Sequence, residues 1–179
     1  MKPMLVVLTA AAIVVAALSA SSSLFAAPAS SSAVAKQQSG FLLLPPAAPA
    51  GQMALFGHIK KLTRKGTRFE LRFDPAWFTS GVTASRAAKE DTGSSDVPND
   101  NYVVEEGHRL LTYLVPTTAH VTVITNNGKG IASTAIPVSE LARIVNGGKH
   151  LKLFEGLESG IWIRVRIDTV RSIDQQYHP

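Results

Sequence analysis

Cysteine is absent from the 179-residue sequence. Its absence excludes disulfide bonds, thiolate zinc sites, iron–sulfur ligation, a cysteine nucleophile and a lipid-anchored cysteine. Charge is scarce at the N-terminus, where Lys2 is the only charged side chain before Lys36. A chain without covalent cross-links depends on core burial and hydrogen bonds, so we expect a folded domain that is not very small.

The N-terminal region 1–29 has the organisation of a secretory signal peptide. A basic start is followed by the apolar run Leu5–Ala20 and then by small residues. Ala27–Ala29 fits the small-x-small cleavage pattern, and cleavage after Ala20 or Ala26 is an alternative. We therefore predict that the protein is secreted or associated with the cell envelope after cleavage.

An uncleaved N-terminal membrane anchor is the competing interpretation of this leader. Its apolar run is short against the roughly 20 residues that a bilayer-spanning helix needs. The membrane is expected to be a partner only if the leader stays on the chain.

Residues 30–52 are rich in Ser, Ala and Pro and show neither a helical nor a strand period. Pro45, Pro46 and Pro49 lack an amide hydrogen and favour extended backbone, so we predict a disordered linker. Phe41–Leu44 is an apolar exception. We expect it to dock on the domain itself, with a partner contact or plain surface exposure as alternatives.

Residues 53–179 are predicted to form a single β-rich domain. Apolar and polar residues alternate along Arg68–Asp74 and Ile161–Asp168, as is typical of half-buried strands. The strand Ala119–Thr125 is expected to end at the turn Asn126–Gly128.

Turn signals add two hairpins to this domain. Gly66 can supply a positive φ in a turn over Arg64–Thr67, and Tyr102–Glu106 with Leu110–Val115 reads as a second hairpin. The predicted fold class is mainly β with minor α: a small antiparallel barrel or curled sheet, OB-like or SH3-like, with two or three short helices.

The helices are expected at three places. Asp74-Pro75 is a cap followed by proline, which favours a turn of helix running to Gly81. Thr83 is expected to cap Ala84–Glu90, and Ser139 to cap Glu140–Val145.

The residues that carry chemistry form no recognisable constellation. No Gly-x-Ser-x-Gly elbow occurs, and the histidines are isolated from one another. The oxygen-rich segment Asp96–Asn101 lacks calcium-loop spacing, so we expect a turn there. The sequence therefore predicts no cofactor, no metal and no catalytic residue, and it favours a non-enzyme. A hydrolase with Asp100 or Asp168 beside a histidine in a deep pocket is the enzymatic alternative.

Positive charge is concentrated in one predicted hairpin. An anionic envelope polymer, a phosphate backbone or anionic lipid headgroups are candidate ligands. Because side chains alternate along a strand, Phe69 and Phe73 are expected to point towards the core. They would then offer no platform on which bases could stack, which disfavours nucleic acid as the ligand. A solvated strand face, or pairing with the acidic segment Glu90–Glu106, is the alternative without a ligand. The candidate anion-binding residues are Lys60, Lys61, Arg64, Lys65, Arg68 and Arg72.

The C-terminal segment Asp168–Pro179 is unusually specific in composition for a chain end. We interpret it mainly as a structural closure of the sheet. A ligand pocket is the alternative, built from Trp162, Arg164, Asp168 and Tyr177.

Three stretches carry a resemblance: DPAWFTSGVTASRAAKEDTG, VPNDNYVVEEGHRLLTYLVP and DTVRSIDQQYHP. They resemble a family of small secreted bacterial proteins of uncharacterised function, over most of residues 54–179. The resemblance implies export and a single domain, and it implies no active site. The function expected is an exported non-catalytic binding or structural module of the bacterial cell envelope or extracellular space, with the anionic-polymer or nucleic-acid binder and the hydrolase as alternatives.

Overall fold

The computed structural model describes residues 47–105, 107, 109–126, 128 and 130–178. The chain divides into two compact units, Met1–Lys36 and Gln37–Pro179, and every described residue lies in the second. The predicted signal peptide and the segment Phe41–Leu44 lie outside the described residues.

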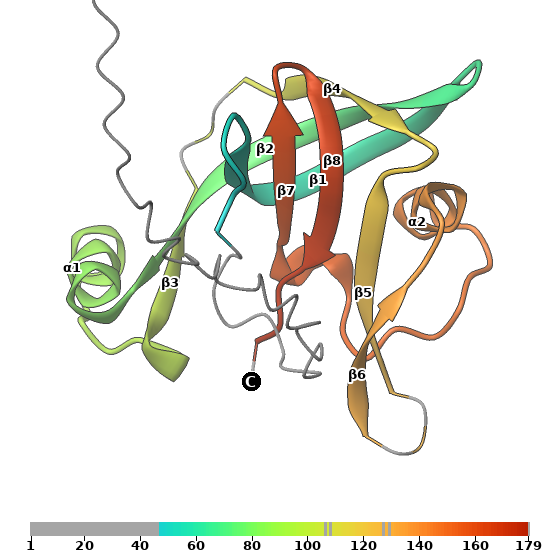
Figure 1. Cartoon of the computed structure of the whole chain (residues 1–179). Helices are drawn as coiled ribbons and strands as arrows, with labels where there is room; N and C mark the ends of the chain where they lie inside the picture. The colour runs from blue at the N-terminus through green and yellow to red at the C-terminus, as the bar shows by residue number, and fades with distance from the viewer. Residues whose placement is uncertain (1–46, 106, 108, 127, 129, 179) are drawn as a thin grey trace, which may run out of the picture. The chain divides into compact units, whose positions relative to one another are not determined.

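The described chain is built mainly from β-strands (Figure 1). Its two α-helices are α1 (Gly81–Thr92) and α2 (Val138–Val145), and short 3₁₀ turns lie at Pro98–Asp100 and Leu157–Ser159. The strands are β1 (Met53–Lys65), β2 (Arg68–Ser80), β3 (Asn101–Val104), β4 (Leu111–Pro116), β5 (His120–Asn126), β6 (Ile131–Ala135), β7 (Ile161–Arg166) and β8 (Thr169–Gln175).

Five of these strands close into a barrel in the order β1–β2–β4–β8–β7 and back to β1. Every neighbouring pair in the circuit is antiparallel except β4 and β8, which meet in parallel at Leu114 and Thr169. Numbered along the chain, the barrel strands follow the order 1-2-3-5-4, which is the connectivity of an OB-fold. The mainly β fold class with a small barrel and minor α is therefore confirmed.

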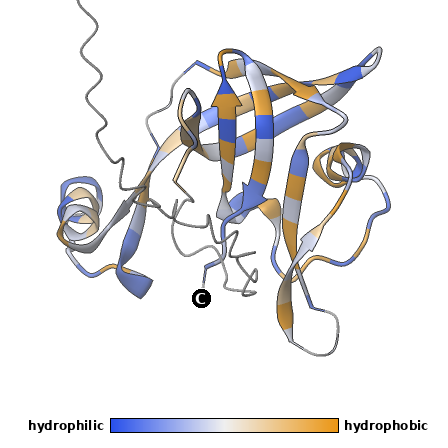
Figure 2. Cartoon of the chain, viewed as in Figure 1, coloured by the Kyte–Doolittle hydropathy of each residue, from blue (hydrophilic) through white to orange (hydrophobic). Residues whose placement is uncertain are grey.

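Apolar side chains from the barrel strands fill the interior of the barrel. Hydrophobic and hydrophilic residues alternate along these strands, most clearly in β7 (Figure 2). Because successive side chains point to opposite faces of a strand, period-two patterning sends one set inward and leaves the other outside. Helix α2 adds a fully buried leucine to the same cluster. Within this cluster, the residues with no exposed surface are Leu62, Leu71, Phe73, Val115, Leu141, Ile163 and Val170.

The helical turn predicted after Asp74-Pro75 is wrong. β2 runs unbroken to Ser80, because its second half pairs with β1 through Gly57 and Pro75 and then with β3 through Trp77 and Val104. β4 leaves β2 at Phe73, so Pro75 has a paired strand on one side only, where a missing amide hydrogen is tolerated.

The predicted hairpin of Tyr102–Glu106 with Leu110–Val115 is also wrong. β3 pairs with the end of β2, and β4 pairs with the beginning of β2. The two strands therefore pair with successive parts of β2 and not with each other.

The remaining local predictions hold with small shifts in boundary. The turn after Lys65 has Gly66 at φ 60°, and β5 and β7 occupy the predicted strand segments. Helix α1 begins at Gly81, earlier than the Thr83 cap, and ends at Gly93 in the left-handed conformation. Helix α2 follows Pro137 instead of Ser139.

Candidate binding surfaces

The outer face of the β1–β2 hairpin presents cations in opposed pairs. Lys61 lies opposite Arg72, and Lys65 lies opposite Arg68. All four side chains are exposed, and the alternate positions Leu62, Leu71 and Phe69 are buried in the barrel. Glu70 lies between the two arginines along β2 and is half-buried. Four of the six predicted anion-binding residues thus share one exposed face.

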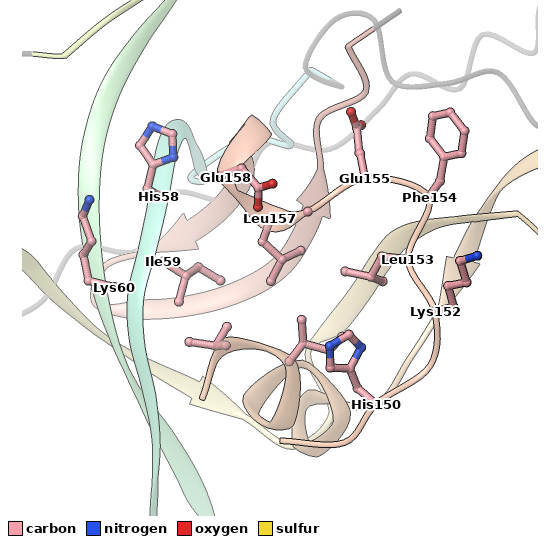
Figure 3. A pocket seen from close by; sticks show the side chains of 13 residues that line it. His58, Ile59, Lys60, His150, Lys152, Leu153, Phe154, Glu155, Leu157 and Glu158 are labelled. Carbon is pink, nitrogen blue, oxygen red and sulfur yellow. The ribbon is translucent and has the colours of Figure 1, made fainter. Parts of the chain in front are cut away.

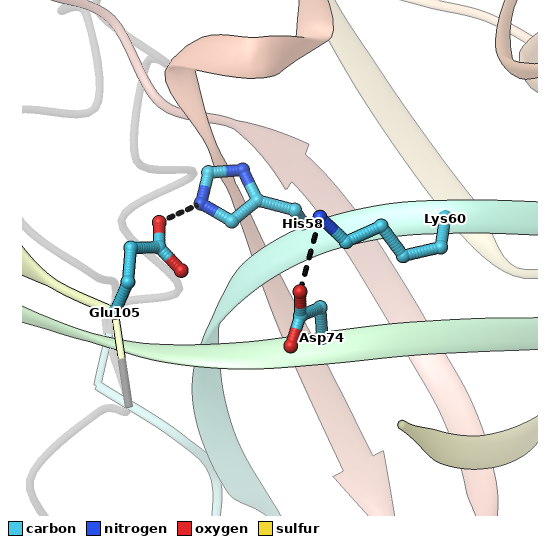
Figure 4. A network of polar contacts seen from close by, with 4 residues as sticks. All are labelled: His58, Lys60, Asp74 and Glu105. Atoms are coloured by element: carbon cyan, nitrogen blue, oxygen red, sulfur yellow. Dashed lines mark hydrogen bonds and ion pairs between the residues drawn. The ribbon is translucent and has the colours of Figure 1, made fainter. Parts of the chain in front are cut away.

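Lys60 and Arg64, the other two predicted residues, are placed differently. Lys60 lies in a bulge of β1, and its Nζ is 3.0 Å from the Asp74 carboxylate (Figure 4). The Arg64 Nε donates to the carbonyl oxygen of Gly66 at 3.2 Å, and its guanidinium lies 6.0 Å from the centre of the Phe69 ring. Arg64 therefore points away from the four-cation face.

The acidic segment that could have neutralised the hairpin has other contacts. His58 Nε2 is 2.6 Å from Glu105 Oε1 (Figure 4), and the Tyr102 hydroxyl donates to Asp91 at 3.3 Å. His58 thus links β1 to the acidic segment, but within the described residues none of the six candidate lysines and arginines forms an ion pair with that segment.

Trp162, Arg164, Asp168 and Tyr177 do not gather in one pocket. Trp162 is buried and donates to the Gln176 side chain at 2.7 Å. Asp168 lies in the exposed β7–β8 turn and accepts a hydrogen bond from Thr169. The Tyr177 ring lies near that of Phe154, at 6.2 Å between centres.

Strand β8 instead ends in a buried polar network. Arg164 donates to the Ser172 hydroxyl at 2.6 Å and lies 3.8 Å from the Asp174 carboxylate, which also accepts from Thr122 at 2.7 Å. The buried polar residues of this strand and its extension are Ser172, Asp174, Gln175 and Gln176. Because these groups satisfy one another, the network joins β8 to β5 and β7 rather than awaiting a ligand.

A cavity of about 660 Å³ lies between β1, α2 and the connection to β7 (Figure 3). Apolar residues of α2 and of 153–157 line it together with His58, Lys60, His150, Glu155 and Glu158. Neither Asp100 nor Asp168 lines it, so the arrangement that would favour a hydrolase is not present at this cavity. No sequence motif indicated this site, since its lining comes from separated segments.

Two titratable groups near this cavity are perturbed by burial. Burial raises the pKa of Glu155 above its ordinary value, and Glu158 adds to the rise, while a hydrogen bond from the His178 backbone opposes it. Burial lowers the pKa of His178, whose Nδ1 is enclosed without a hydrogen-bond partner.

A second cavity, of about 580 Å³, is an apolar groove on the outside of the barrel. The rings of Phe56, Phe78 and Trp162 pack there with centres 5.0–5.8 Å apart. Trp77 and Leu111 also line it and are 60% and 37% exposed. We call this surface the aromatic groove. It was not predicted from the sequence, in which the adjacent Trp77 and Phe78 are its local signal.

Comparison with known proteins gives no relative: no family model, no curated protein and no solved structure matches the chain. Among the described residues, no helix combines the length and apolarity needed to span a membrane. The same residues contain no group of three or more His, Asp or Glu side chains arranged to hold a metal ion. Asp96–Asn101 includes a 3₁₀ turn, within which Asn99 has φ 57°.

Proposed function

We propose that the protein is an exported, non-catalytic binding module that holds an anionic polymer of the cell envelope on the outer face of the β1–β2 hairpin. The observation that carries this proposal is the pairing of like charges, Lys61 with Arg72 and Lys65 with Arg68, on an exposed surface. The proposal of export is based on the leader 1–29. Determining the N-terminus of the mature protein tests it, and a chain that begins after the leader would support export.

Opposed like charges weaken the fold that carries them. Like charges placed directly opposite each other on neighbouring strands destabilise a sheet. The acidic segment does not relieve this repulsion within the described residues, because Glu105 contacts His58 and Asp91 contacts Tyr102. A polyanion laid along the hairpin would relieve it, so binding and stability would rise together.

The location of this face suits a binding surface. In OB-folds, the outer face of the second and third barrel strands and the neighbouring loops bind oligonucleotides and oligosaccharides. Here those strands are β2 and β4, and Arg68 and Arg72 pair with Pro116 and Thr112 of β4.

The polymer is expected to be recognised by charge and not by base stacking. Phe69 and Phe73 are buried in the barrel, at 3% and 0% exposure, so they offer no platform for bases. We therefore favour a phosphate- or carboxylate-bearing envelope polymer over nucleic acid.

The test compares two triple variants of equal net charge. Lys61→Ala, Lys65→Ala and Arg68→Ala removes three cations of the face. The control removes three exposed cations elsewhere, Arg86, Lys89 and Lys149. Binding to heparin, as a model polyanion, is measured against salt concentration.

The hairpin variant should bind more weakly, and its slope of log K against log salt should become shallower by roughly 0.7–0.9 for each lost anionic contact. The control variant should keep most of the affinity and slope. Equal losses in both variants would show attraction by net charge alone, and unchanged binding in the hairpin variant would remove the proposed site.

A further inference from the structure

The aromatic groove borders an open strand edge. Its lining includes Ala54–Phe56 of β1, Pro75–Phe78 of β2 and Trp162. The described pairing of β1 with β2 begins only at Phe56, so no described residue pairs with Met53–Leu55 on that side. An apolar groove beside unpaired backbone amides and carbonyls is suited to an extended peptide segment.

The chain reverses its direction immediately before this edge. The Gln52 amide donates to the Pro49 carbonyl oxygen at 2.9 Å, and Gly51 has φ 75°. That geometry is a tight turn with glycine at its third position, where a positive φ is required. The turn therefore reverses the direction of the chain between residues 47–49 and the start of β1 (Figure 1).

The sequence on the far side of the turn has the matching chemistry. Phe41–Leu44 consists of four consecutive large apolar residues, and it is followed by Pro45 and Pro46, which favour extended backbone. Nine steps separate Leu44 from Met53, and an extended chain covers at most about 3.3–3.6 Å per residue, so the reach of roughly 30 Å exceeds what docking beside β1 requires.

We propose that Phe41–Leu44 of the same chain occupies the aromatic groove and covers Trp77. The segment thereby anchors the linker to the barrel beside β1. Because Trp77, Met53 and Leu111 are exposed around the groove, an apolar segment supplied at high local concentration by the chain itself is the occupant that the geometry favours.

Tryptophan fluorescence of the full-length chain tests this proposal directly. The protein has two tryptophans, and both line the groove. Leu42→Ser with Leu43→Ser should shift the emission maximum to longer wavelength and increase quenching by acrylamide. Gln37→Ser with Gln38→Ser, in the same linker, should leave both unchanged. Emission and quenching unaltered by the leucine changes would overturn the proposal.

Cross-linking provides a second measurement in a cysteine-free background. Each residue of Phe41–Leu44 is changed in turn to Cys together with Leu111→Cys, in the groove, or with Ser133→Cys, on β6. A disulfide needs Cα atoms within about 7 Å. At least one groove pair should form an intramolecular disulfide, and no Ser133 pair should.

Two results would contradict docking in cis. Dimers that increase with protein concentration would mean that the segment enters the groove of a second copy. The absence of any groove disulfide would mean that another molecule, or none, occupies the groove.

Discussion

Gln175 offers the sharpest test of the polar network that closes the barrel. Its side chain is 2% exposed and connects three segments. The side-chain oxygen accepts from the Ile124 amide at 2.8 Å, and the side-chain nitrogen donates to the carbonyl oxygens of Glu155 and Gly156 at 3.1 and 3.0 Å. Gln175→Ala removes all three hydrogen bonds without changing the strand.

The expected cost follows from the number and burial of these bonds. A typical intramolecular hydrogen bond contributes about 0.5–1.5 kcal/mol net, and a buried donor left without a partner costs about 1–3 kcal/mol. The Ile124 amide would be such a donor, while the two carbonyls lie on a loop that water can reach more easily. We therefore expect Gln175→Ala to lower the free energy of unfolding by about 3 kcal/mol.

Urea unfolding, followed by tryptophan fluorescence, measures this loss. Arg171→Ala is the control, because Arg171 is exposed on the same strand and should change stability by less than about 0.5 kcal/mol. Both variants should keep the wild-type m-value, so that midpoints compare stability alone. A Gln175→Ala loss no larger than that of Arg171→Ala would refute the view that this network stabilises the barrel.

The remaining predictions concern a close packing contact and a buried histidine. Gly57→Ala should destabilise the protein by about 3 kcal/mol or more in urea unfolding, because a Cβ there would collide with the backbone of Asp74. Gly148→Ala is the control and should be tolerated, because a Cβ at Gly148 would lie at an ordinary contact distance from Arg143. Burial lowers the pKa of His178 below 6.5 in the folded protein. The contribution of the neutral His178 to the free energy of unfolding should therefore be fully present above pH 6.5 and be lost as the pH falls through the folded-state pKa. His178→Gln should flatten this decline, and an unchanged pH profile of unfolding midpoints would contradict it.

The strands β2 and β7 could be predicted because their signal is local. Ile161, Ile163 and Val165 alternate with polar residues, and a one-residue shift would expose the whole apolar set. The same reasoning predicted the burial of Phe69 and Phe73. Arg68 and Arg72 alternate with these buried residues along β2, and the turn at Gly66 sets the register that places two lysines of β1 opposite them.

The partners of β3 and β4 could not be predicted, because strand pairing is decided by distant segments. The local pattern of Tyr102–Val115 suits a hairpin, but β2 is long enough to pair with both strands in succession. Pro75 is a residue that locally favours a helix start, but its pairing with Gly57 keeps it in a strand, so the predicted helical turn was wrong. The groove was hidden for the same reason: Phe56, Phe78 and Trp162 meet only after β1, β2 and β7 are placed.

The position of β8 explains how a chain without cysteine holds its C-terminus. β8 lies inside the sheet, bonded to β7 on one side and to β5 and β4 on the other. Fraying of the last residues would therefore leave the Thr122 hydroxyl and the Trp162 indole N–H, which stay in the barrel, without their partners on Asp174 and Gln176. A buried polar group without a partner costs more free energy than its hydrogen bond contributes when formed. The partly opened state, in which these groups lack partners, is therefore raised in free energy. A disulfide acts mainly by restricting the unfolded chain, whereas this network penalises partial opening of the folded one. The segment 168–178 thus secures the chain end by hydrogen bonds, which denaturants weaken and reducing agents do not affect.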